Sequence, residues 1–207
     1  MTSLAGQDGR KTTPPPPSAP TSYQKVFSQV PVTALAFYTD KKHDLLLAGE
    51  HADILVYECE SRKLISRQRI FDDQPIHGVR VDGDQAIFWG SSYIAVADLN
   101  GCNDGRPLSV KRCTAPDWVF DAAASPFDPN LYVLATAHNE IVTVRNEKDT
   151  DLLLLGRVIA PARPGLYSAQ LAWISINCVL MVAGTAFGEI LVWKSHLDKH
   201  GPDAHEM

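Results

Sequence analysis

The fold is decided by the stretch Leu180-Met-Val-Ala-Gly-Thr-Ala-Phe-Gly-Glu-Ile-Leu-Val-Trp193, in which an apolar run meets a turn of small residues and resumes as a second apolar run. The same arrangement occurs at residues 45–57, 86–96 and 132–144. Equivalent valines lie 40, 48 and 48 residues apart (Val56, Val96, Val144 and Val192). A period of about 40 to 50 residues in a chain of strands is typical of propeller blades. Propellers are usually binding platforms, so the repeat favours binding over catalysis.

Strand-like runs separated by turn residues extend over a partial propeller that we place at residues 23–195. Its blades are expected at about residues 31–70, 76–113, 118–159 and 167–194, and the fourth offers only three strands. We therefore predict an all-β fold, a β-propeller of about four blades that form an incomplete, open ring. An open ring exposes apolar blade faces. The isolated chain is expected to associate or aggregate.

The middle strands support blades rather than a plain sandwich. Leu45–Ala48, Tyr132–Ala135 and Val179–Ala183 are almost continuously apolar, which fits strands covered on both faces. The outer strand at Lys63–Ile70 is mixed instead. Ahead of the first blade, Tyr23–Val30 is either the outer strand that closes the last blade or only a linker, and the sequence leaves both open.

The two ends of the chain differ from its middle. Residues 1–22 contain Pro14 to Pro17 and Pro20 among small polar residues, and we predict a disordered Pro-rich arm there. Residues 196–207 are predicted to be a flexible tail. No run approaches 18 apolar residues, and the four cysteines form no CxxC pair. We expect a cytoplasmic protein with reduced thiols and no membrane partner.

The charge balance argues against a self-sufficient nucleic-acid binder. The chain has 19 basic and 24 acidic residues, a formal net charge of −5. Such binders usually carry a basic excess. No contact with DNA is expected, and any contact with RNA would have to come from a local cluster of cations.

Several phrases resemble the amino-terminal blades of the WD-repeat-containing protein 6 family over about residues 30–195. They are Pro31-Val-Thr-Ala-Leu-Ala, Leu47-Ala-Gly-Glu with Ile54-Leu-Val-Tyr57, Ile76-His-Gly-Val-Arg80, Asp117-Trp-Val-Phe-Asp-Ala122 and Val182–Trp193. The specificity lies in their order, because any one could occur in another propeller. The resemblance implies degenerate WD repeats: only Trp193 keeps the tryptophan of the usual Trp-Asp pair, and Lys194 replaces the aspartate.

The resemblance also implies a function and partners. Its fungal family member partners the methyltransferase that modifies the ribose 2′-hydroxyl of tRNA position 34. This chain is then expected to be a non-catalytic scaffold that binds the tRNA 2′-O-methyltransferase subunit and helps to position tRNA. A general WD-repeat adaptor in endosomal recycling or ubiquitin ligation, with no RNA role, is the alternative.

Motifs for catalysis are weak. A methyltransferase would need a glycine-rich loop between a strand and a helix, and no such unit is visible; the GxSxG pattern of hydrolases is absent as well. His196, His200 and His205 lack companions at metal-ligand spacing. We predict that the chain is not an enzyme, holds no cofactor and binds no metal.

One basic stripe is the candidate for contact with RNA or a partner. It consists of Arg62, Lys63, Arg67 and Arg69 on the first outer strand and Arg106, Lys111 and Arg112 at the matching place in the second blade. Such a stripe can contact phosphates. The alternative is an outer strand that charge protects from aggregation.

Other polar and aromatic residues invite weaker interpretations. His51 and His138 each occupy the turn between a second and a third strand, which makes that rim a candidate contact surface. Trp89, Trp118 and Trp173 are expected to be buried between blades. Asp117 and Asp121 are expected to accept hydrogen bonds from neighbouring turn amides rather than act as catalytic carboxylates.

Overall fold

The computed structural model describes residues 30–40, 43–148, 150–159 and 165–197, and in them it contains four antiparallel sheets. We call the sheets blades 1 to 4. Blade 1 contains β1 (Val32–Thr39), β2 (Asp44–Glu50), β3 (Asp53–Glu58) and β4 (Leu64–Arg69). Blade 2 contains β5 (Gly78–Asp82), β6 (Gln85–Gly90), β7 (Tyr93–Asp98) and β8 (Ser109–Thr114), with a 3₁₀ turn at Cys102–Asp104.

The other two blades follow the same plan. Blade 3 contains β9 (Val119–Ala124), β10 (Leu131–Thr136), β11 (Glu140–Asn146) and β12 (Leu152–Ile159). Blade 4 contains β13 (Leu166–Ser175), β14 (Cys178–Thr185) and β15 (Ile190–His196). Each blade is a meander in which neighbours along the chain are neighbours in the sheet. The expected strands are thus present, and the fourth blade has three of them in the described part of the chain.

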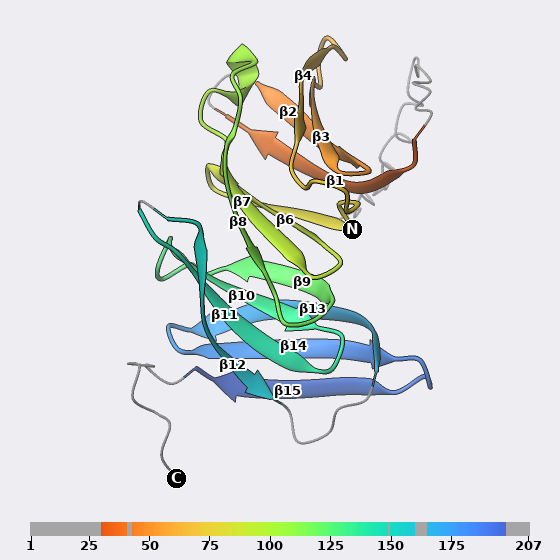
Figure 1. The fold of residues 1–207 in the computed structure, drawn as a ribbon, viewed down its shortest axis with the longest axis vertical. Helices are drawn as coiled ribbons and strands as arrows, with labels where there is room; N and C mark the ends of the chain where they lie inside the picture. The colour runs from red at the N-terminus through yellow and green to blue at the C-terminus, as the bar shows by residue number, and fades with distance from the viewer. Residues whose placement is uncertain (1–29, 41–42, 149, 160–164, 198–207) are drawn as a thin grey trace, which may run out of the picture.

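The blades succeed one another in chain order along the long axis of the molecule (Figure 1). In blades 2 to 4, a residue at or just before the start of the first strand donates a backbone hydrogen bond to the preceding blade. Ile76 N donates to His51 O at 2.7 Å, Val119 N to Ser91 O at 2.7 Å and Leu166 N to Ala137 O at 3.0 Å. All three acceptors lie at the turn between the second and third strands. Each blade is therefore attached to its predecessor in the same way.

The core consists of three apolar layers, one between each two consecutive blades. In β6, Ala86 and Phe88 pack toward blade 1, whereas Ile87 and Trp89 pack toward blade 3. Likewise Leu134 of β10 faces blade 2 and Val133 faces blade 4. Because successive side chains of a strand point to opposite faces, a middle strand with neighbours on both sides must be apolar throughout. This explains the uninterrupted apolar run at Tyr132–Ala135. The runs in β2 and β14 were expected to be covered on both faces as well, but these strands lie in the end blades and pack on one neighbouring blade each, and Val182 of β14 is 40% exposed.

The outer faces of blades 1 and 4 have no such cover among the described residues. Leu35 and Phe37 of β1 are 60% and 71% exposed, and Ile190 and Val192 of β15 are 78% and 62% exposed. Isolated exposed apolar residues are ordinary, but contiguous ones mark an interaction surface. The ring is open at both of these faces.

Some expectations fall outside the described residues. The arm at residues 1–22 does, as do residues 198–207 of the expected tail and all of Tyr23–Val30 except Val30. Within the described part, β15 continues through His196, and Leu197 is buried with its amide bonded to Asn177 O at 2.7 Å. The described part of the chain contains no helix with the length and apolarity that crossing a membrane requires.

Candidate functional site

The outer strands of blades 1 and 2 lie side by side and carry four cations of the basic stripe: Arg67 and Arg69 in β4 and Lys111 and Arg112 in β8. Arg62, Lys63 and Arg106 lie in the segments that precede these strands, and not on the strands as expected. Gln68 of β4 joins the two blades, because its amide donates to Leu108 O at 2.9 Å and its carbonyl accepts from Leu108 N at 2.6 Å. The structure therefore brings the two halves of the predicted stripe into one region. The seven cations differ in the groups that they contact.

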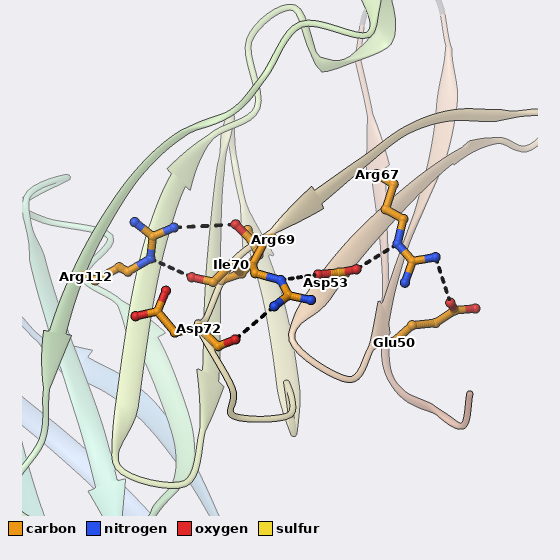
Figure 2. A network of polar contacts seen from close by, with 7 residues as sticks. All are labelled: Glu50, Asp53, Arg67, Arg69, Ile70, Asp72 and Arg112. Atoms are coloured by element: carbon orange, nitrogen blue, oxygen red, sulfur yellow. Dashed lines mark hydrogen bonds and ion pairs between the residues drawn. The ribbon is translucent and has the colours of Figure 1, made fainter. Parts of the chain in front are cut away.

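Arg67 and Arg69 bind acidic side chains of their own blade (Figure 2). Arg67 Nε donates to Asp53 Oδ2 at 2.7 Å, and Arg69 Nε donates to Asp53 Oδ1 at 3.0 Å. Glu50 lies 4.0 Å from Arg67 Nη1, and both carboxylates are buried. The two arginines therefore neutralise acids that the fold has placed on the open side of blade 1.

Arg112 and Lys111 connect blades. Arg112 of β8 donates through Nε to Ile70 O at 2.5 Å and through Nη2 to Arg69 O at 3.5 Å, which ties blade 2 to the end of β4 (Figure 2). Lys111 Nζ donates to Glu147 O and, at 3.1 Å, to Lys148 O in the turn after β11. These side chains brace three successive blades at their outer edges, a role that the sequence pattern did not indicate.

Arg62, Lys63 and Arg106 are the exposed remainder of the stripe. Arg106 is 75% exposed and forms an ion pair with the exposed Asp104 at 3.6 Å. Exposed pairs of this kind contribute little to stability. Whether any of the seven cations contacts RNA stays a prediction. These three are exposed, and a phosphate at Arg106 would replace only the exposed pair with Asp104.

The Asp53 pair makes stability depend on pH in a defined direction. Burial alone would raise the pKa of Asp53, but the hydrogen bonds from Arg67 and Arg69 outweigh it, and the pKa lies below its ordinary value. A carboxylate with a lowered folded pKa stabilises the fold above its unfolded pKa of about 4 and loses that effect as pH falls through the folded value. We expect Asp53→Asn to lower the urea midpoint at pH 7 and to approach wild type as the pH falls through the lowered folded pKa of Asp53. A deficit that is constant with pH would contradict this.

The second surface is the rim formed by the turns after each second strand and the segments that enter each following blade. We call it the turn rim and define it as residues 51–52, 71–77, 91–93, 115–118 and 137–139. His51, Ser91 and Asn139 adopt positive φ angles of 52°, 52° and 60° in its turns. The predicted rim position of His51 and His138 is confirmed, and both side chains are exposed.

Four residues at the junction of blades 2 and 3 form a compact group on this rim, which we call the rim cluster: His77, Asp117, Trp118 and His138. The rings of His77 and Trp118 have centroids 4.9 Å apart and are tilted by 48°. Asp117 accepts a hydrogen bond from Trp118 N at 2.7 Å, and its other oxygen contacts His138 Nδ1. Burial lowers the pKa of His77, so its ring is neutral at pH 7.

Trp118 corrects one expectation. It does not lie on a strand buried between blades, because β9 begins at Val119 and the indole is 42% exposed. The preceding Pro116-Asp117 pair is a turn signal that could have indicated this. Trp89 is buried as expected, and Trp173 is half-buried against the core between blades 3 and 4. No sequence signal pointed to His77.

The two aspartates have separate roles. Asp117 accepts from a turn amide, as expected. Asp121 does not: its buried carboxylate accepts from Arg80 Nη2 of blade 2 at 3.1 Å and from Leu171 N of blade 4 at 2.7 Å. It therefore links three blades. In the described part of the chain, no group of three or more potential metal ligands is present.

Comparisons with known proteins identify the fold. No protein-family model and no curated protein matches the sequence. Among solved structures 515 chains match. The crystal structure of Saccharomyces cerevisiae Sqt1 is similar with a TM-score of 0.59 at 11% identity, over 79% of this chain and 45% of that one, so this chain spans less than half the length of Sqt1. Together with the four meander sheets, this likeness confirms the fold of a β-propeller, whose described blades form an open arc.

Proposed function

We propose that this chain is a non-catalytic WD-repeat scaffold whose turn rim binds a partner protein. The rim cluster is the observation that carries the proposal. Trp118 is exposed, its indole contacts the ring of His77, and its backbone amide donates to Asp117. An exposed tryptophan is the kind of side chain that dominates binding energy at protein interfaces. The propeller fold, which usually serves as a binding platform, supports the same interpretation.

We propose further that the partner is the tRNA 2′-O-methyltransferase subunit that acts at position 34, and that tRNA is positioned within the complex. The support is the ordered set of phrases shared with the WD-repeat-containing protein 6 family. In this division of labour the enzyme supplies cofactor and chemistry. Arg62, Lys63 and Arg106 are the cations available to tRNA phosphates, and each such contact would make binding depend on salt.

The adaptor alternative has its own support. Arg67 and Arg69 are neutralised by Asp53, and Arg112 and Lys111 are engaged by backbone carbonyls of neighbouring segments. Four of the seven cations in the stripe thus have structural contacts, and the whole chain carries a net charge of −5. A scaffold that binds only proteins would need no more positive charge than this.

The rim is tested by comparing two exposed aromatic residues at opposite ends of blade 3. Trp118→Ala should weaken binding of the methyltransferase at least tenfold, because a hot-spot tryptophan typically contributes about 2 kcal/mol or more. Phe127→Ala is the control: Phe127 is 50% exposed, but it lies in the turn between the first and second strands, at the opposite rim. Titration calorimetry with the purified enzyme measures both affinities. Equal losses, or none, would refute the rim as the binding surface.

Mapping of 2′-O-methylation at tRNA position 34 separates the two functions. In cells that lack the gene, we expect this methylation to fall and the wild-type chain to restore it, with Phe127→Ala restoring it equally and Trp118→Ala restoring it poorly. Intact methylation in those cells would leave only the adaptor function.

A further inference from the structure

The two open blade faces are the largest feature that the proposed function does not use. On blade 1, Leu35, Phe37 and Leu64 are 60%, 71% and 50% exposed. Leu35 also borders a hollow of about 430 Å³ that Leu46 and Tyr57 line as well. On blade 4, Val182, Ile190 and Val192 are 40%, 78% and 62% exposed. Both faces are predominantly apolar, which is unusual for surfaces that stay in water.

The two faces are of complementary kinds. Inside the molecule, the face of each blade that looks forward along the chain packs on the backward-looking face of the next blade. Blade 1 leaves a backward face open and blade 4 leaves a forward face open. Packing blade 4 of one molecule on blade 1 of another would therefore repeat a contact that the chain already makes three times.

We propose that two copies of this chain close a single ring of eight blades, with blade 4 of each copy packed on blade 1 of the other. Eight blades lie within the usual range for propellers. A two-fold axis through the centre of the ring relates the two contacts, which are therefore identical. The assembly is closed.

Interface area favours a closed pair over an open string of molecules. Three strands spaced about 4.8 Å apart and six residues long at about 3.3 Å per residue cover a face of roughly 300 Å². One contact would then bury about 600 Å² from both partners, which is typical of crystal packing, whereas two contacts bury about 1,200 Å², the lower bound for specific complexes. A dimer with both contacts made is thus stable where a single contact is not.

Charges on the two faces are compatible with this pairing. Glu50 and Glu58 line the hollow on blade 1, and Lys194 is exposed on the open side of β15. Arg67 and Arg69 already neutralise Asp53 at the edge of the blade 1 face. Arg62 lines the same hollow, so the blade 1 face carries both signs of charge and the exposed lysine of blade 4 meets no face of like charge alone.

Sedimentation equilibrium on the full 207-residue chain tests the proposal. We expect a discrete dimer at micromolar concentration. Because each face takes part in the ring, Leu35→Asp on blade 1 and Val192→Asp on blade 4 should each give a monomer. Phe127→Asp, at an exposed apolar position on neither open face, should leave the dimer intact. Circular dichroism verifies that all three variants keep the strand content of wild type.

The design separates the ring from its rivals. A dimer through blade 1 faces alone would survive Val192→Asp, and one through blade 4 faces alone would survive Leu35→Asp, and either result would overturn the ring. A wild-type chain that is monomeric at all concentrations, or that forms a continuous series of larger species, would overturn it as well. The melting temperature should rise with concentration for wild type and not for the two face variants.

Discussion

Replacing Asp121 by alanine is expected to destabilise the protein by about 3 kcal/mol, because it removes one partner of a buried ion pair. Three blades meet at this carboxylate: Asp121 belongs to β9 of blade 3 and binds Arg80 of β5 and the amide of Leu171 in β13. Burial raises the pKa of Asp121 against the opposing effect of Arg80. The carboxylate is thus costly to bury and depends on both partners.

The alanine variant leaves two groups without their acceptor. The buried amide of Leu171 loses its bond of 2.7 Å, and an unsatisfied buried donor costs about 1 to 3 kcal/mol. Arg80 is about one-third exposed and can regain some hydration, so we place the total at the lower end of the range for broken buried pairs. Urea unfolding at pH 7 measures the loss.

Two controls make the result specific. Asp121→Asn keeps an acceptor for Leu171 N and should lose less than the alanine variant. Asp128→Ala removes the partner of Arg145, a half-exposed pair with a separation of 3.3 Å, and should change stability by no more than about 1 kcal/mol. Equal effects of Asp121→Ala and Asp128→Ala would show that Asp121 does not tie the blades together.

The second large effect is expected for Gly90→Ala, at about 3 kcal/mol or more of lost stability. A Cβ atom at Gly90 would lie 1.9 Å from the carbonyl oxygen of Pro75 and 3.4 Å from His77 N. These are backbone atoms of the segment that joins blade 1 to blade 2, so no side-chain rotation relieves the clash. That segment must move, and His77 N would then lose its 2.7 Å bond to Trp89 O. Overpacking of this kind typically costs about 1 to 3 kcal/mol before any such bond is lost.

Gly165→Ala is the matched control for this substitution. Nothing lies within 4 Å of a Cβ atom at Gly165, and its φ is not in the left-handed region. We expect its melting temperature to stay within about 2 °C of wild type, which for a chain of this size corresponds to less than about 1 kcal/mol. Similar melting temperatures for the two alanine variants would show that the linker tolerates displacement.

The sequence predicted the strands best where the pattern of buried residues repeats from blade to blade. The burial of β6 and β10 on both faces followed directly from residue type, because a middle strand between two blades has no polar face. The turns at His51 and Ser91 could be predicted equally well, since two polar or small residues separate apolar runs there. These are local patterns, and strand existence depends mainly on them.

The contacts between blades could not be predicted from the sequence. Arg80 and Leu171 lie 41 and 50 residues from Asp121 in the chain, so no local pattern could select them as its partners. The same holds for Asp53, whose short sequence separation from Arg67 and Arg69 becomes meaningful only once the register of β3 with β4 is known. Charge type could be read from the sequence, but the choice of partner required the fold.

Because each blade packs only on its chain neighbours, a single molecule has two terminal units that are held on one side. Such an array loses structure from its ends inward, since a terminal unit gives up one interface where an inner unit gives up two. Amide hydrogens of blades 1 and 4 then exchange with solvent sooner than those of blades 2 and 3. Joining two molecules into a ring leaves no terminal blade. Local unfolding then has to begin by separating an interface between two blades of the closed ring.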